Sequence, residues 1–201
     1  MEQIALPLKA GNGPAGIVVG SANAVVAEAL TMPESWPFRT AVLTGPPRSG
    51  KSLFARWFAE SGRGEAIDDA QTLLEDAVFH RWNRAQESGT ALLVVGGEPP
   101  WNIALPDLRS RLGGSLQLEI TQPDDVMAHE LLLSLADERG LLLPVEGADY
   151  LVPRASRSQA ELERLVAMID RLSLERKAPP TQGIWRAALE AVHGPVEPRL
   201  L

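Results

Sequence analysis

The sequence predicts an α/β fold: a parallel sheet flanked by helices, followed by a small all-α domain. Short apolar runs at residues 40–44, 91–95 and 116–120 alternate with segments of helical periodicity. This alternation is typical of a parallel sheet that is covered on both faces. A glycine-rich loop joins the first of these runs to a helical pattern. After about residue 122 the strand-like runs stop, and only helical patterns follow.

The segments before the sheet are short. Residues 1–14 form a tail that ends in glycines and a proline, residues that typically mark turns. An apolar run and a helix of small residues follow in GIVVGSANAVVAEAL, and the next segment, MPESWPF, is expected to be a proline-rich loop. The first strand should therefore begin close to residue 40.

Strands and helices are expected to alternate from there to about residue 122. The strands are Thr40–Thr44 (TAVLT), Ala91–Val95 (ALLVV) and Leu116–Ile120 (LQLEI). Apolar residues recur at helical spacing behind the first strand, and a short amphipathic segment covers Leu105–Leu112. A helix over residues 71–87 should carry an apolar face made of Leu73, Leu74, Ala77, Val78 and Trp82.

Helix signals dominate the rest of the chain. Asp124 is placed to cap a helix, DDVMAHELLLSLADERG, which Gly140 should end. Ser158 and Glu161 form a capping box, and the helix that follows has one apolar face. A last helix is expected around Trp185. These patterns predict a helical domain after the sheet.

The composition excludes several classes of function. The chain has 201 residues, of which 45% are hydrophobic and 22% charged, ordinary values for a globular protein with its own core. Because it has no cysteine, a disulfide framework, a cysteine-ligated metal and thiol catalysis are excluded. A net charge of -7 argues against wrapping DNA by electrostatic attraction. We therefore expect DNA contact to be local, or to be made indirectly through a partner.

The apolar pattern, the N-terminal residues and the lack of cysteine also indicate the cellular compartment. No apolar stretch of about 18 residues is present, so no membrane span is expected. The start, MEQIALPLKAGNGP, lacks the basic and apolar regions of a secretory signal, and the lack of cysteine fits a reducing compartment. We therefore expect a cytoplasmic protein. His80, His129 and His193 lie far apart and lack the spacing of metal ligands.

A phosphate-binding loop is the most specific motif. Residues 45–52, GPPRSGKS, fit the pattern G-x-x-x-x-G-K-[ST], with a strand before and a helix after. In such a loop, backbone N–H groups and the helix N-terminus surround phosphates, Lys51 meets the β- and γ-phosphates, and the Ser52 hydroxyl reaches Mg²⁺. The residues expected at a nucleotide are Gly45, Pro46, Arg48, Ser49, Gly50, Lys51 and Ser52. The alternative is an ordinary turn before a helix.

Two acidic residues follow in the segment EAIDD, residues 65–69. If this is the end of a strand, Asp68 would hold Mg²⁺ through water and Asp69 would polarise the attacking water. If it is the start of the next helix, the same carboxylates would cap that helix and interact with its dipole. The apolar stretch before them is short, and a usual α/β layout would fit another strand there. Both interpretations stay open.

Four segments together resemble one family, the DnaA-related regulators called Hda (HdaA), which consist of a DnaA-like AAA+ module without the DNA-binding helical domain. GSANAVVAEAL resembles the adenine-side segment, and WPFRTAVLTGPPRSGKS the strand and phosphate loop. LPDLRSRL with LQLEITQPDD resembles the arginine-finger helix, and YLVPRASRSQAELERLVAMIDRLSLERK the lid. The resemblance implies three parts: a clamp-binding tail (1–12), a P-loop AAA+ α/β domain (13–121) and a helical lid (122–201).

The resemblance also implies roles for single arginines. Arg111 would be the arginine finger, which acts in trans on the γ-phosphate of a nucleotide held by a neighbouring protein. Arg157 would be the sensor arginine of the lid and would contact phosphate in cis, with Arg154 and Arg164 near enough to be confused with it. Without the resemblance, each is an ordinary arginine on a helix surface.

The N-terminal tail resembles a sliding-clamp-binding peptide, whose pattern is Gln, an apolar residue, any residue, Leu, any residue, then Leu or Phe. Gln3, Leu6 and Leu8 match this pattern. The two leucines would fill apolar pockets, the Gln3 amide would donate and accept at the rim, and Pro7 would restrict the free tail. The alternative is a disordered tail, or an edge strand that packs on its own domain.

Two departures from the family bear on hydrolysis. After the strand ALLVV the chain continues GGEPP, residues 96–100, without the Ser, Thr or Asn that would sense a γ-phosphate. The segment before Asp68 is also short. Both departures argue against ATP hydrolysis by the chain itself, and neither affects Arg111, which would act in trans.

Three functions are compatible with these features. The first is a regulator that holds ADP or ATP with Mg²⁺, binds the DNA polymerase sliding clamp (β subunit) and stimulates hydrolysis of ATP on the initiator DnaA, which suppresses re-initiation of chromosomal replication. The second is an autonomous P-loop ATPase or kinase, which requires Asp68, Asp69 and intrinsic turnover. The third is a degenerate nucleotide-binding scaffold without catalysis. The oligomeric state stays open, with a homodimer as one option.

Overall fold

The structure, a computed structural model, describes residues 16–194, which form two compact units. The first unit comprises residues 16–19 and 23–121, and the second comprises residues 20–22 and 122–194. Over this described part of the chain, no helix has the length and apolarity that crossing a membrane requires.

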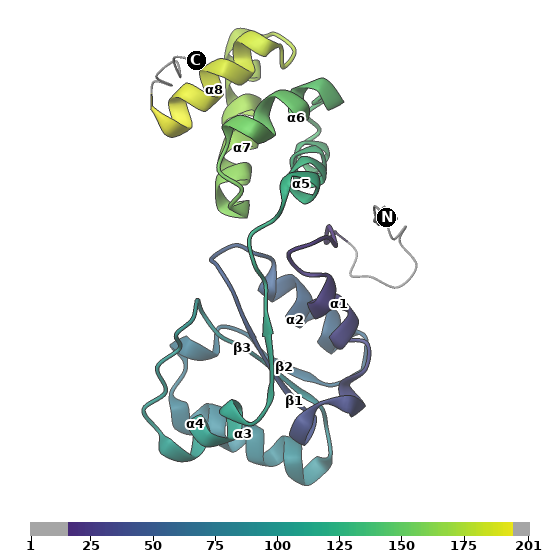
Figure 1. Cartoon of the computed structure of the whole chain (residues 1–201), viewed down its shortest axis with the longest axis vertical. Coiled ribbons are helices and arrows are strands. Elements are labelled where there is room, and N and C mark those ends of the chain that lie inside the picture. Colours follow the sequence, from purple (N-terminus) through teal and green to yellow (C-terminus); the bar gives the residue numbers. More distant parts are fainter. Residues whose placement is uncertain (1–15, 195–201) are drawn as a thin grey trace, which may run out of the picture. The chain divides into compact units, whose positions relative to one another are not determined.

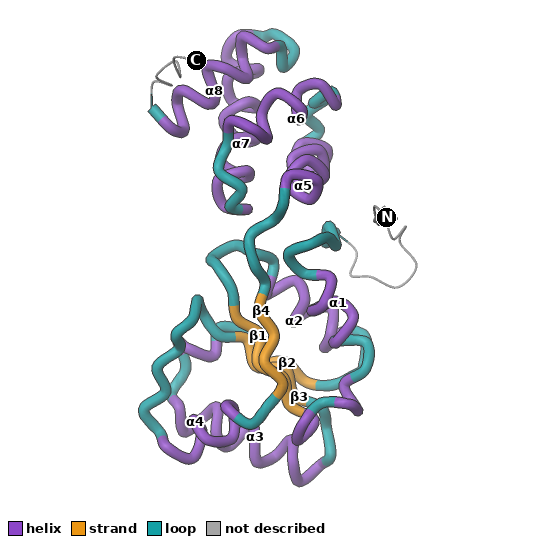
Figure 2. Tube along the Cα trace, viewed as in Figure 1, coloured by secondary structure: helices purple, strands orange, loops and turns teal. Residues whose placement is uncertain are grey.

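A four-stranded parallel sheet forms the centre of the first unit (Figure 2). Its strands are β1 (Thr40–Thr44), β2 (Glu65–Ile67), β3 (Leu92–Val95) and β4 (Leu116–Glu119), in the order β2-β3-β1-β4. The central strands β1 and β3 are apolar and buried, as expected where helices cover both faces. Because all strands run the same way, their carboxyl ends meet at one edge of the sheet.

Helices cover both faces of this sheet (Figure 1). On one side lie α1 (Ala24–Ala29) and α2 (Lys51–Glu60), and on the other lie α3 (Glu75–Ser88) and α4 (Pro106–Gly113). Alternate strand residues point to opposite faces. One set packs in a buried cluster with α3 and α4 that comprises Val42, Ile67, Ala70, Val78, Trp82, Ala85, Leu92, Val94, Leu108 and Leu112.

The second unit is helical: α5 (Asp125–Glu138), α6 (Val145–Leu151), α7 (Gln159–Arg176) and α8 (Gln182–His193). Both expected caps are confirmed. The Asp124 side chain accepts a hydrogen bond from the Met127 N–H at 2.8 Å, and Ser158 accepts one from the Glu161 N–H at 3.3 Å. The other half of the capping box is not formed, since the Glu161 carboxylate instead lies 2.7 Å from Nδ1 of His193.

The predicted fold class is confirmed, and the differences are local. The helix predicted over residues 71–87 begins only at Glu75, because a 3-10 turn at Ala70–Thr72 comes first. Leu73 and Leu74 therefore lie outside the apolar face of α3, with 43% and 80% of their surface exposed. The proline-rich loop contains two 3-10 turns, Pro33–Ser35 and Pro37–Arg39, each opened by a proline whose fixed φ suits that position.

Candidate functional site

The phosphate-loop sequence connects β1 to α2 at the edge where the strands end. Gly45 has φ +148°, and a Cβ there would stand 2.7 Å from the backbone oxygen of Ile120. Gly50 has φ +89° and caps α2, whose first residue is Lys51. Glycine is required at both positions, because a side chain would be strained by the backbone conformation and, at Gly45, would also collide with the end of β4.

The Lys51 ammonium lies inside the curve of this loop. Its Nζ donates to the backbone oxygens of Gly45 at 2.8 Å and Pro46 at 2.7 Å. Burial lowers the pKa of Lys51 from its usual value, and the negative charges of Asp69, Asp68 and Glu98 oppose this shift. A partly buried cation with acidic groups around it is the electrostatic setting of a phosphate and Mg²⁺ site.

Other groups of the loop also fit an anion. Ser49 is only 6% exposed, and its Oγ has no hydrogen-bond partner among the described residues, which is rare for a buried hydroxyl. Arg48 has φ +60°, a left-handed conformation that costs a non-glycine residue energy. Ser52 is exposed in the first turn of α2. These donors and the helix N-terminus make the loop compatible with a phosphate group.

A magnesium ion would depend on that phosphate. Within residues 16–194, no group of three or more His, Cys, Asp or Glu side chains is arranged to hold a metal ion. Mg²⁺ is commonly held by one or two carboxylates together with phosphate oxygens. Ser52 and Asp68 are the protein groups that would take part.

The acidic pair follows the short edge strand β2. Asp69 has φ +48° and is followed by the 3-10 turn, and its N–H donates to Oδ1 of Asp68 at 3.0 Å. Neither carboxylate caps α3, which begins later and has Leu74 as its N-cap; Asp69 is the N-cap residue of the 3-10 turn, where its side chain makes no capping hydrogen bond. Both carboxylates instead belong to the strand end beside Lys51. The chain passes from α2 to β2 without another strand, and β2 closes the sheet at its edge.

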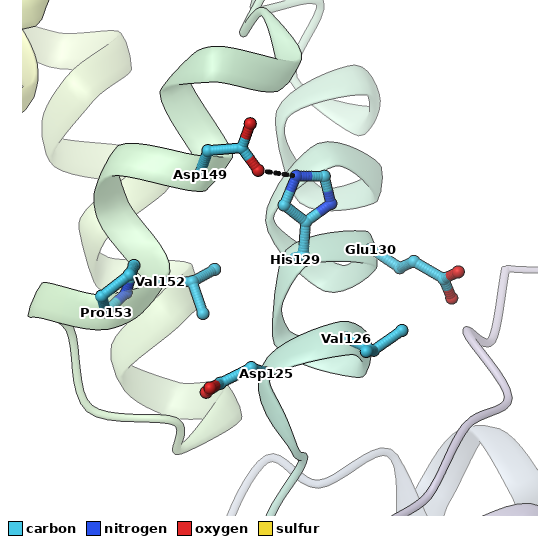
Figure 3. A pocket seen from close by; sticks show the side chains of 7 residues that line it. All are labelled: Asp125, Val126, His129, Glu130, Asp149, Val152 and Pro153. Atoms are coloured by element: carbon cyan, nitrogen blue, oxygen red, sulfur yellow. Dashed lines mark ion pairs between the residues drawn. The ribbon is translucent and has the colours of Figure 1, made fainter. Parts of the chain in front are cut away.

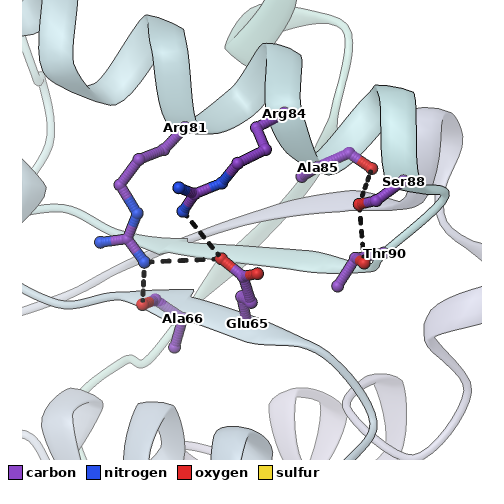
Figure 4. Close-up of polar contacts among 7 residues, drawn as sticks. All are labelled: Glu65, Ala66, Arg81, Arg84, Ala85, Ser88 and Thr90. Atoms are coloured by element: carbon purple, nitrogen blue, oxygen red, sulfur yellow. Dashed lines mark hydrogen bonds and ion pairs between the residues drawn. The ribbon is translucent and has the colours of Figure 1, made fainter.

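Polar contacts protect that edge (Figure 4). Glu65 lies 3.8 Å from Nη2 of Arg81 and 3.7 Å from Nη2 of Arg84, both on α3. Arg81 also donates to the backbone oxygen of Ala66 at 3.1 Å. Unpaired backbone groups at a sheet edge invite pairing with other chains. This cover assigns Glu65 to the sheet edge rather than to a nucleotide site.

The end of β3 carries no side chain able to sense a phosphate. The Gly96 N–H donates to the backbone oxygen of Leu43 at 2.9 Å, and the Gly45 N–H donates to the backbone oxygen of Gly97 at 3.3 Å. Backbone hydrogen bonds therefore tie this strand end to the base of the phosphate loop. Glu98 follows and is exposed. Glu98 could not be predicted from sequence spacing, because its influence on Lys51 depends on β3 lying next to β1.

Arg111 lies on α4, where it stacks between two aromatic rings of α3. Its Cζ is 4.3 Å from the centroid of the Trp82 ring and 5.0 Å from that of Phe79. The neighbouring helix start is fixed as well, since the Glu75 carboxylate accepts hydrogen bonds from the N–H groups of Ala104 at 2.8 Å and Leu105 at 2.5 Å. The structure thus holds Arg111 against its own unit.

Arg157 lies in the second unit, in the loop before α7. Its Nε is 2.7 Å from Oδ1 of Asp125. Arg154 donates to the backbone oxygen of Tyr150 at 2.8 Å and stacks on its ring at 4.2 Å. The loop residues 45–52 and the acidic pair lie in the first unit, at the carboxyl ends of β1 and β2, whereas Arg154, Arg157 and Arg164 belong to the second unit. The tail residues Gln3, Leu6, Pro7 and Leu8 lie outside the described residues.

The second unit has a pocket of about 440 Å³ between α5 and α6 (Figure 3). Nε2 of His129 lies 3.1 Å from Oδ1 of Asp149 there. The pocket is lined by Asp125, Val126, His129, Glu130, Asp149, Val152 and Pro153. This pocket could not be predicted from helical periodicity, because the sequence did not indicate a helix at Val145–Leu151. Its rim is acidic, which does not suit a phosphate.

No model of a known protein family matches the chain. An uncharacterized protein of Haemophilus influenzae is 29% identical over 117 residues, which are 54% of this chain and 51% of that protein. The chain thus spans about half the length of this curated relative.

Solved structures are similar in fold. Domain III of the replication initiation protein DnaA of Thermotoga maritima superposes with a TM-score of 0.75 at 15% identity, over 92% of this chain and 98% of that one. AMPPCP-bound DnaA of Aquifex aeolicus gives 0.64 at 17%, over 83% and 67%. The RuvB Holliday junction branch migration motor of Thermotoga maritima gives 0.59 at 17%, over 79% and 64%. The chain has a DnaA-like AAA+ fold.

Proposed function

We propose that this chain is a nucleotide-binding AAA+ protein that regulates the initiation of replication. The observation that carries the nucleotide site is the position of Lys51, whose ammonium lies inside the phosphate loop, partly buried, with acidic groups around it. The ligand would be ADP or ATP with Mg²⁺. The proposal is supported by AMPPCP-bound DnaA among the proteins of similar fold.

A binding measurement tests the site. Lys51→Met should weaken binding of a fluorescent ADP analogue about 10- to 100-fold, because a hydrogen bond to a charged group contributes about 1.5–3 kcal/mol. Lys177→Met is the matched control, since Lys177 ends α7 in the second unit and should leave affinity unchanged. Equal affinity of wild type and Lys51→Met would refute a nucleotide site at this loop.

We further propose that the chain is a regulator of the Hda type. The chain would bind the β-subunit sliding clamp through Gln3, Leu6 and Leu8, and it would present Arg111 to ATP bound on DnaA. Support comes from the tail pattern, from the LRSRL segment and from the DnaA-like fold. Contact with DNA would be made through the clamp.

Two measurements test this finer proposal. The first is competition of the full-length protein with a fluorescent peptide of residues 1–12 for the clamp, which a Gln3→Ala, Leu6→Ala, Leu8→Ala variant should lose. The second is single-turnover hydrolysis of ATP on DnaA with clamp present. Arg111→Ala should abolish the stimulation, whereas Arg109→Ala, two residues earlier on the same helix, should keep it. Stimulation that survives Arg111→Ala would rule out this arginine finger.

The alternative function, an autonomous ATPase or kinase, would require turnover by the isolated protein that does not depend on Arg111. The pair Asp68 and Asp69 beside Lys51 favours it. Turnover by the isolated protein that is lost in Asp69→Asn and kept in Arg111→Ala would select this function. A chain that binds nucleotide, shows no turnover and does not stimulate DnaA would be the degenerate scaffold.

A further inference from the structure

The end of β3 adjoins the phosphate loop. The backbone oxygen of Gly97 accepts a hydrogen bond from the N–H of Gly45, the first residue of the phosphate loop, at 3.3 Å, so a side chain at position 97 would begin next to that loop. The chain has glycine there, and the sequence therefore offers no polar group at this strand end. The space next to Gly97 is nevertheless filled.

The side chain of Gln71 fills it. A Cβ built on Gly97 would have Gln71 Cγ at 3.6 Å, Cδ at 3.7 Å and Nε2 at 3.9 Å as its three nearest atoms. These are ordinary van der Waals distances, so the carboxamide of Gln71 lies in contact with the position from which a side chain of residue 97 would begin. It comes from the 3-10 turn after β2, and β2 pairs with β3.

The turn holds Gln71 in this position. Ala70 is buried at 1% exposure, and the Thr72 backbone N–H donates to the backbone oxygen of Asp69 at 2.9 Å. The Gln71 Nε2 donates to Oδ1 of Asp69 at 3.3 Å. Of the acidic groups that act on Lys51, Asp69 raises its pKa the most, although burial still lowers that pKa overall. Gln71 therefore shares one strand-end cluster with the lysine of the phosphate loop.

The chemistry of a carboxamide suits a terminal phosphate. It has two N–H donors and one acceptor oxygen, and only one donor is engaged with Asp69 at a long distance. A neutral donor can bind a phosphate oxygen without the cost of burying a second charge. We propose that Gln71 takes the place of the missing side chain at position 97 and distinguishes a nucleoside triphosphate from a diphosphate at this loop. This inference rests on the proposed nucleotide site.

The test compares affinities for ADP and for a nonhydrolysable ATP analogue, both with Mg²⁺, by calorimetry. Gln71→Ala should weaken the triphosphate about 10-fold, the effect of one hydrogen bond to a charged group, and should change ADP less than about twofold. The control is Thr72→Ala, which removes a polar side chain of the same turn and should change neither affinity.

A double variant distinguishes a role of Gln71 in binding the terminal phosphate from a role in maintaining the turn. Gly97 is not among the glycines with positive φ, and a Cβ there meets only ordinary contacts, so Gln71→Ala with Gly97→Asn should fold. It should restore the triphosphate affinity, because the new carboxamide starts from the space that Gln71 leaves.

Four outcomes would overturn the inference. Equal loss of both nucleotides in Gln71→Ala would show a structural role, as would the same loss in Thr72→Ala. Unchanged discrimination in Gln71→Ala would exclude this residue as the sensor, while the nucleotide site itself stands. A wild type that binds neither nucleotide removes the proposed nucleotide site, and the sensor with it.

Discussion

Removing the charge of Arg111 should destabilise the first unit. The guanidinium lies 4.3 Å from the centroid of Trp82 and 5.0 Å from that of Phe79, and the Trp82 side chain is 6% exposed. A cation over one ring contributes about 0.5–1 kcal/mol when exposed and about 2 kcal/mol when desolvated. With two rings and a half-buried arginine, we expect Arg111→Met to lower the free energy of unfolding by about 1–2 kcal/mol.

Urea unfolding followed by tryptophan fluorescence measures this loss. Trp185 is the tryptophan of the second unit, so the other four report mainly on the first. With a slope of about 2 kcal/mol per molar urea, the midpoint should fall by about 0.5–1 M. The control is Arg109→Met on the same helix. Among residues 16–194, the exposed Arg109 guanidinium hydrogen-bonds only the Ile103 oxygen, at 3.5 Å, so this variant should change stability by less than about 0.5 kcal/mol. Equal midpoints for the two variants would refute the stacking argument.

The energy of this stacking, about 1–2 kcal/mol, also affects how readily Arg111 could act as the proposed arginine finger. If Arg111 acts as that finger, it would have to leave the rings, at least in part, to reach a phosphate on another protein. The stacking energy would then oppose that step by about 5- to 30-fold in equilibrium terms. A Phe79→Leu variant should weaken the stack and raise the fraction of Arg111 free to act. If Phe79→Leu stimulates DnaA less than wild type does, the rings position the arginine rather than restrain it.

Three further predictions test local features. Because burial lowers the pKa of Lys51, its ¹³C-methylated amine should titrate below the usual value of 10.5. Bound nucleotide should raise that pKa, since phosphates favour the charged form of the amine. Titration at or above 10.5 without nucleotide would contradict the first expectation. Ser158→Ala removes the acceptor for the Glu161 N–H and should cost about 1 kcal/mol of stability, measured by thermal unfolding against Thr181→Ala, at an N-cap whose side chain makes no capping hydrogen bond. Gly147→Ala should destabilise α6 and shift Trp185 emission to the red, because a Cβ would stand 2.9 Å from that ring; a more stable variant would refute it.

Local chemistry explains why several features could be predicted from sequence. The phosphate loop, the Asp124 cap and the Ser158 cap each involve groups a few residues apart, so their spacing is visible in the chain. The alternation of apolar runs with helical patterns predicted the fold class, because a parallel sheet requires crossover helices. The short α6 was missed. Gly147 lowers its helix propensity, and only the close approach of Trp185 shows why glycine is needed there.

The sequence by itself determined the loop with Lys51, the helix caps and the parallel α/β class. Tertiary structure decided which distant residues meet at the strand ends. Gln71 fills the space beside Gly97 because β2 pairs with β3, and Arg111 lies on Trp82 because α3 and α4 cover the same face of the sheet. The strand order β2-β3-β1-β4 differs from the order in the chain. Local spacing carries no information about that order, which depends on the burial of apolar surface by the whole sheet.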